Sequence, residues 1–117
     1  MPRFPSPAAA GVAALASAIA LGAPGAVAAP AKTVSFRAVD FKFVGLPKTI
    51  TPGRHTFSVV NRGQAMHNFK LAGKKTRLLA TGQKATLTVQ LKRGRYAYLC
   101  TVPGHAQLGM RGTIVVK

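Results

Sequence analysis

Acidic side chains are almost missing from this chain: Asp40 is the only one, against seventeen lysines and arginines. The resulting formal charge of +16 at neutral pH repels copies of the same chain and attracts anionic partners. We therefore expect a monomer that meets an acidic partner protein, or an anionic membrane or cell-wall surface. The basic residues are mostly scattered, without a stripe interleaved with exposed aromatics, so we do not expect nucleic acid as a partner.

Cysteine is equally scarce, because Cys100 is the only one in the chain and an internal disulfide is therefore excluded. A single cysteine in an exported protein needs an explanation, such as intermolecular pairing, reactivity or metal binding. Taken alone, the residue would be read as a small buried hydrophobic side chain, since free cysteines are often buried.

Long apolar runs are missing too, apart from the 14-residue run Ala8–Leu21 near the N-terminus. Its length is typical of the central region of a signal peptide, and the small residues that end at Ala28 suit a signal peptidase. The alternative is an uncleaved membrane anchor, although a span needs about 20 apolar residues. We predict a secreted, periplasmic or cell-envelope protein, with a signal peptide at 1–28, a short linker at 29–32 and one domain at 33–117.

Helical periodicity is absent after the leader, where short β-type runs alternate with glycine and proline turn signals about every ten residues. Thr86–Leu91 alternates strictly, with its leucines and valine expected to point inward. Only Lys74–Gly82 resists the pattern, and it is interpreted as an excursion or a short strand plus loop. The spacing predicts an all-β fold, an antiparallel Greek-key β-sandwich of about seven to eight strands.

What the sequence does contain is a group of soft donors on one uncharged stretch. Cys100, His105 and Met110 follow one another with four residues between each pair, and His67 lies upstream at the start of another strand. Two histidines, one cysteine and a weak axial methionine form the ligand set of a type 1 copper site. The turn pair Pro103-Gly104 is expected to fold His105 back toward Cys100.

The loop pattern C-x4-H-x4-M, with Pro-Gly before the histidine and Gly before the methionine, resembles the copper loop of cupredoxins. Its Cys-to-His spacing is similar to that of azurin and its His-to-Met spacing to that of plastocyanin, a combination found in auracyanin-like proteins. The pair His67-Asn68 resembles the family's upstream ligand and the asparagine that follows it. The resemblance covers about residues 33–117 and implies a cupredoxin-like copper-binding domain.

The resemblance implies one copper ion, with His67, Cys100 and His105 as strong ligands and Met110 as the long axial ligand. It further implies that Asn68 ties the two ligand-bearing loops together and supports the site.

Two other kinds of site use some of the same residues. A cysteine-protease triad of Cys100, a histidine and Asn68 matches the residue types, but the chain is short for a substrate cleft and Met110 would be unexplained. Structural zinc prefers four cysteine or histidine ligands, so His55 would have to serve. We expect His55 to be a surface residue at the start of a strand.

The expected function is single-electron transfer outside the cytoplasm by Cu(I)/Cu(II) cycling, and not enzymatic catalysis. An alternative is a copper carrier or buffer without redox work. A copper oxidase or reductase would need a second copper centre, which three histidines cannot supply. The uncharged stretch Tyr96–Met110 is expected to form an apolar docking surface around the edge of His105.

Overall fold

The computed structural model describes residues 30–117, and all of their regular secondary structure is β. The predicted signal peptide at 1–28 lies outside these residues. The first strand begins at Lys32, the last residue of the predicted linker. Between residues 30 and 117 there is no helix with the length and hydropathy needed to cross a membrane.

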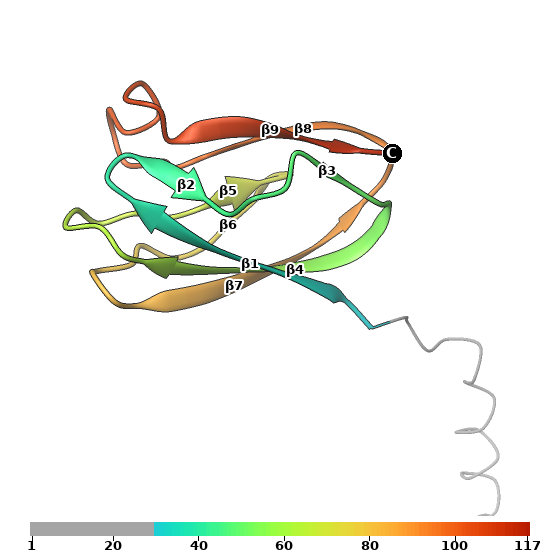
Figure 1. Ribbon diagram of the computed structural model, residues 1–117, viewed down its shortest axis with the longest axis horizontal. Helices are drawn as coiled ribbons and strands as arrows, with labels where there is room; N and C mark the ends of the chain where they lie inside the picture. The colour runs from blue at the N-terminus through green and yellow to red at the C-terminus, as the bar shows by residue number, and fades with distance from the viewer. Residues whose placement is uncertain (1–29) are drawn as a thin grey trace, which may run out of the picture.

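The strands form two layers that pack face to face (Figure 1). The first sheet contains, in spatial order, β2 (Lys42–Val44), β1 (Lys32–Val39), β4 (Gly53–Asn61) and β7 (Lys84–Leu91). The second contains β3 (Thr49–Ile50), β9 (Arg111–Val116), β8 (Gly94–Leu99), β5 (Lys70–Leu71) and β6 (Lys74–Lys75).

The predicted all-β sandwich is confirmed, but its sheets are mixed rather than purely antiparallel. Strand β1 pairs in parallel with β4, and β3 pairs in parallel with β9. Parallel neighbours need a connection that returns the chain to its starting end. The segment between β1 and β4 provides it, because β2 lies in the first sheet and β3 in the second. The two-residue strands β3, β5 and β6 bring the number of described strands to nine.

The interior of the sandwich follows the alternation seen in the sequence. In β7, Leu87, Val89 and Leu91 are buried while the residues between them are exposed, as predicted. Phe36 of β1 contacts the ring of Phe69 edge-on, with centroids 4.7 Å apart. Aromatic rings from both sheets join this contact and fill the centre of the core: Phe43, Phe57 and Tyr98.

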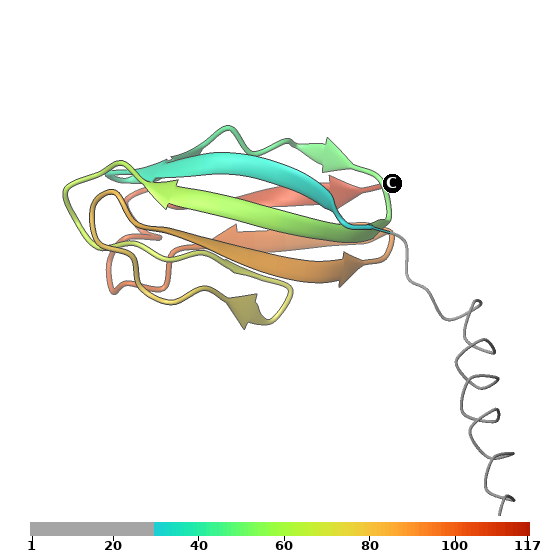
Figure 2. The same cartoon turned by 90° about the horizontal axis from the view of Figure 1, so that it is seen from below.

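One end of the sandwich gathers three connections that are distant in sequence. The turn after β1, the loop after β4 and the loop between β8 and β9 all lie at the end opposite the C-terminus (Figures 1 and 2). Strands β1 and β4 are parallel, so the connections that follow them leave the sheet at the same end. Strands β8 and β9 are antiparallel, so one loop at a single end of the sandwich joins them. The loops that carry His67 and Cys100–Met110 therefore meet at the same end.

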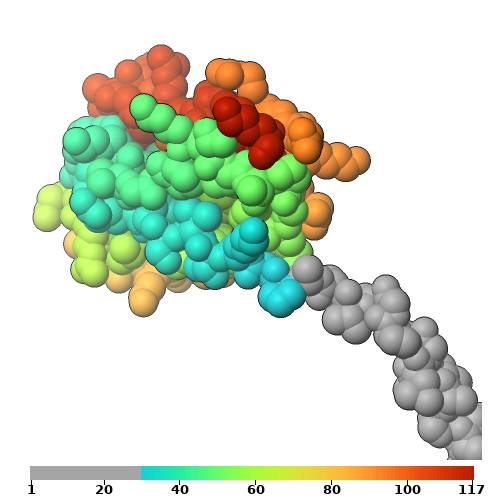
Figure 3. Space-filling model, turned by 45° about the vertical axis from the view of Figure 1, so that its right-hand side comes forward, coloured from blue at the N-terminus to red at the C-terminus, as the bar shows by residue number. Residues whose placement is uncertain are grey.

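The other end carries His55, and here the sequence expectation was wrong. His55 is only 3% exposed, and its Nε2 atom lies 2.8 Å from the carbonyl oxygen of Thr51. Strand β4 begins earlier than the sequence indicated, so His55 lies within it rather than at its start. Its side chain points into the sandwich, as does that of Phe57 two residues later, and the two rings lie close together. Figure 3 shows this side of the molecule, where the C-terminal residues of β9 lie beside the segment containing β3.

Candidate metal centre

His67 is held in place by a pair of backbone hydrogen bonds to the segment at residues 74–82. Its backbone N–H donates to the carbonyl of Leu79 at 3.1 Å, and the N–H of Leu79 donates back at 2.8 Å. Both side chains are fully buried. The stretch that lacked a clear period in the sequence thus fixes the backbone on which His67 stands.

The loop from Cys100 to Met110 is closed by hydrogen bonds at its base. The N–H of Cys100 donates to the carbonyl of Met110 at 3.0 Å, which extends the pairing of β8 and β9 by one step. Within the loop, the N–H of Met110 donates to the carbonyl of His105 at 3.1 Å. Gly104 and Gly109 have φ values of 85° and 122°, which side-chain-bearing residues rarely adopt. These bends return His105 to Cys100 and place Met110 in the interior.

Three donor atoms converge where the two loops meet. The Nδ1 atoms of His67 and His105 are 3.2 Å apart, and Cys100 Sγ lies 3.6 Å from His105 Nδ1. A ligand atom from each of the three residues lies within 4.8 Å of the other two. His67 and Cys100 are buried, whereas His105 is partly exposed, so the group opens to solvent through His105.

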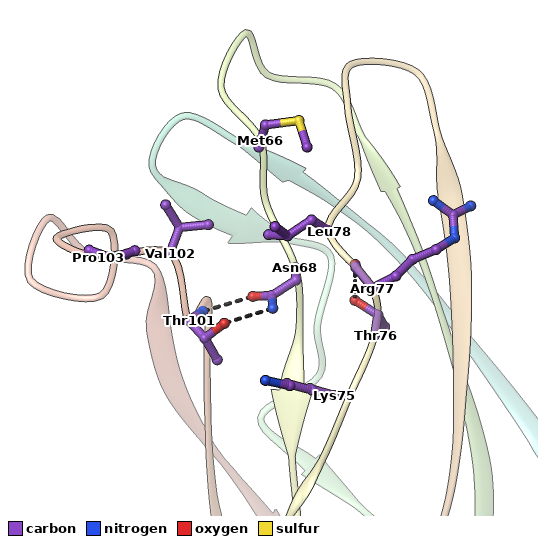
Figure 4. Close-up of a pocket in the computed structure, with 9 residues that line it drawn as sticks. All are labelled: Met66, Asn68, Lys75, Thr76, Arg77, Leu78, Thr101, Val102 and Pro103. Carbon is purple, nitrogen blue, oxygen red and sulfur yellow. Dashed lines mark hydrogen bonds between the residues drawn. The ribbon is translucent and has the colours of Figure 1, made fainter.

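Asn68 links the two loops beside these donors. Its side-chain oxygen accepts from the backbone N–H of Thr101 at 2.7 Å, and its amide nitrogen donates to Thr101 Oγ1, also at 2.7 Å (Figure 4). Thr101 directly follows Cys100, so this pair of bonds holds the thiol-bearing backbone against the neighbour of His67. Because the Asn68 side chain is engaged in this way, it does not orient a histidine, and the triad of Cys100, a histidine and Asn68 is not formed.

Asp40 was not identified as a site residue from the sequence, although it is the only acidic residue. Its Oδ1 atom lies 2.6 Å from His67 Nε2. The N–H of Gln64 donates to Oδ2 at 2.9 Å and that of Ala65 to Oδ1 at 3.2 Å. These backbone bonds, led by Gln64 and aided by His67, outweigh partial desolvation and hold the pKa of Asp40 below its ordinary value.

His105 lies at the boundary between the site and solvent. Phe41 covers part of it, with ring centroids 4.9 Å apart and the planes inclined at 68°. Burial lowers the pKa of His105, and the neighbouring His67 lowers it further while Asp40 opposes the effect. Its imidazole is therefore kept neutral to lower pH than usual, and a neutral imidazole is the form that binds metals.

The donor set fits copper better than zinc. Metal bonds to histidine and cysteine are about 2.0–2.3 Å long, so donors around one ion lie on the order of 3–4 Å apart, as they do here. Two imidazole nitrogens that face each other at 3.2 Å can share a cation. His55 is engaged with Thr51 at the other end of β4, so it does not complete a zinc set. The fully buried Met110 next in the loop is a soft donor that suits copper.

A sandwich with two histidines, one cysteine and a buried methionine at one end defines a cupredoxin. A sequence model of the family described as "copper binding proteins, plastocyanin/azurin family" matches residues 55–117. The chain belongs to this family, and copper is its metal. No curated protein sequence matches the chain at a significant level.

Solved structures share the fold at low sequence identity. Reduced auracyanin from the photosynthetic bacterium Roseiflexus castenholzii is 20% identical, with a TM-score of 0.63 over 76% of this chain and 99% of that one. An azurin from Methylomonas sp. strain J is 17% identical, with a TM-score of 0.60 over 75% and 99%. A multicopper oxidase is 15% identical, with a TM-score of 0.62, but the match covers 77% of this chain and 46% of the oxidase chain.

Proposed function

We propose that this protein carries single electrons between redox partners outside the cytoplasm. The observation that carries the proposal is the convergence of His67, Cys100 and His105 within 4.8 Å of one another, with His105 the partly exposed member. These three residues would bind copper strongly, and Met110 would bind it weakly. Such a ligand set supports one-electron exchange between Cu(I) and Cu(II).

The rigidity of the site supports electron transfer over copper carriage. His67 is fixed by its paired bonds to Leu79, and Cys100 by bonds to Met110 and, through Thr101, to Asn68. A cage that cannot relax toward the preferred geometry of either oxidation state changes little when an electron moves. The same rigidity slows release of the ion. A copper carrier, in contrast, must release its ion readily.

Export is part of the proposal and rests on the leader seen in the sequence, because residues 1–28 carry the composition of a signal peptide. The proposal that the chain is not itself an enzyme rests on its histidine count, since three histidines cannot build a second copper centre.

The surface beside the site suits a partner with an apolar contact zone and negative charge around it. Several large apolar side chains near the two loops are exposed: Phe41, Met66, Leu78 and Leu108. Met66 and Leu78 line a groove together with Val102 and Pro103 of the copper loop (Figure 4). Lys75 and Arg77 also line this groove. An acidic redox protein is therefore the partner we propose, rather than a membrane or wall polymer.

Copper retention during turnover tests electron transfer against carriage. The protein loaded with copper is cycled repeatedly between oxidised and reduced states in the presence of an excess of a Cu(I) chelator. An electron carrier keeps its copper through many cycles, and the Cys100→Ser variant serves as the control that releases it. Complete transfer of copper to the chelator within the first few cycles would contradict the proposal and favour a carrier.

A further inference from the structure

The only carboxylate side chain of the chain lies against the metal centre, and we propose that Asp40 is a positioning residue that tunes it. By accepting a hydrogen bond from His67 Nε2, Asp40 directs the lone pair of Nδ1 toward Cys100 and His105. Its negative charge then favours the more highly charged oxidation state of the metal. The proposal rests on the proposed electron-transfer function and specifies how the potential of that site is set.

The contact between Asp40 and His67 is short and well supported. The two atoms, Asp40 Oδ1 and His67 Nε2, lie 2.6 Å apart, and His67 has no exposed side-chain surface while that of Asp40 is 26% exposed. Backbone N–H groups can only donate, so the bonds from Gln64 and Ala65 require both carboxylate oxygens to act as acceptors. These bonds favour the ionised carboxylate, which has no proton to give, so the proton in the contact belongs to His67 Nε2.

The loop between β4 and His67 is shaped around this carboxylate. A Cβ atom at Gly63 would overlap Asp40 Oδ1 and would lie 3.0 Å from the backbone nitrogen of Asp40. Gly63 is held there from the other side, because its N–H donates to Asn61 and its carbonyl accepts from Thr81. Asp40 is therefore packed into the support of the site, unlike an ordinary surface charge.

The tautomer explains why the contact matters for a metal ligand. A neutral imidazole has one N–H and one lone pair, and which nitrogen binds metal is decided by the hydrogen bond that the other makes. With Nε2 donating to Asp40, the lone pair of Nδ1 faces His105 Nδ1 at 3.2 Å. A carboxylate behind a histidine ligand also raises the basicity of that ligand. The other charged side chains of the chain are all cations, so no second carboxylate can replace this effect.

The substitution Asp40→Asn tests the charge while keeping the size of the side chain. Loss of a supporting carboxylate lowers metal affinity by about 10–100-fold. If Cu(II) binding weakens about tenfold relative to Cu(I) binding, the reduction potential rises by about 59 mV for this one-electron couple. Thr81→Val is the matched control, because it removes a bond to the same loop at Gly63 without changing a charge. We expect this control to lower stability and leave the potential unchanged.

A measurement on the metal-free wild-type protein tests the hydrogen bond without any variant. The ¹⁵N chemical shifts of His67 report which ring nitrogen carries the proton. We expect the Nε2–H tautomer. A predominant Nδ1–H tautomer, or an Asp40→Asn variant whose potential shifts no more than that of Thr81→Val, would overturn the proposal. A wild-type protein that holds no copper but shows the Nε2–H tautomer would contradict the proposed function and leave the Asp40–His67 contact standing.

Discussion

Met110 is the residue that we propose to bind copper weakly, and its surroundings allow its contribution to be tested separately. It is fully buried, and its backbone is fixed to Cys100 and His105. Leucine has nearly the same volume, so the change is expected to cost less than about 1.5 kcal/mol of stability.

Met110→Leu is therefore expected to keep the colour of the copper protein and to raise its reduction potential, because removal of the thioether weakens Cu(II) binding most. Visible absorption and redox titration of the same sample check this. Loss of copper altogether in the variant would show that Met110 is not the weak axial ligand.

Tyr98 offers a test that does not involve the metal. Burial raises the pKa of its phenol above the ordinary value near 10. The stability linked to the neutral phenol is present below pH 10 and is lost as the pH rises through the raised pKa, because the unfolded chain ionises first.

Tyr98→Phe keeps a ring packed on Phe43 and Phe69 and removes the ionisable group. We expect metal-free wild type and variant to have similar stability at pH 7 and the variant to be the more stable above pH 10. Urea unfolding at both pH values measures the difference. If the two proteins lose the same amount of stability at high pH, ionisation of the Tyr98 phenol is not the cause of the loss.

At the scale of elements, the site depends on the junction between two loops that are separated by more than thirty residues. Asn68 makes both bonds of that junction, to the N–H and to the hydroxyl of Thr101. Asn68→Ala leaves the partly buried amide of Thr101 without its partner, at a cost of up to about 1–3 kcal/mol.

We expect Asn68→Ala to lower the unfolding free energy by about that amount and to speed copper loss to a chelator. Thr101→Val removes only the hydroxyl bond and is expected to have the smaller effect on both measurements. If the two variants behave alike, the backbone bond is not what joins the loops.

At the scale of the whole molecule, the charge of +16 should control how fast partners meet. Opposite charges steer association, and salt screens this steering over about 10 Å at 0.1 M ionic strength. The electron-transfer rate with an acidic partner is therefore expected to fall steeply as salt rises.

Lys75→Glu changes the charge at the groove beside the site, while Arg54→Glu makes the same change at the start of β4, near the opposite end. Stopped-flow rates at low salt should fall several-fold for the first variant and less for the second, with unchanged potentials. Equal effects of the two substitutions would indicate steering by total charge, with no docking at the groove.

Much of this organisation could be predicted from sequence because it depends on local patterns. The alternation in Thr86–Leu91 gave the buried face of β7, and the Pro-Gly and glycine signals gave the bends of the copper loop. Spacing within one loop limits where its side chains can lie, so Cys100 and His105 could be grouped before the structure was known.

Features that depend on long-range placement could not be predicted in this way. Asp40 reaches His67 only because β1 and β4 are parallel neighbours that end together. The burial of His55 depends on where β4 begins, and turn signals locate that point only approximately. The scarcity of acidic residues was a usable signal for Asp40, since a lone carboxylate among so many cations marks a position with a specific task.

The central claim, that Cys100 and its neighbours form a type 1 copper site, is tested most directly by the visible spectrum of the purified protein with Cu(II). We predict an intense thiolate-to-copper absorption band that is absent from the Cys100→Ser variant under the same conditions. A wild-type protein that stays colourless with Cu(II), and binds it no better than Cys100→Ser does, would contradict the assignment.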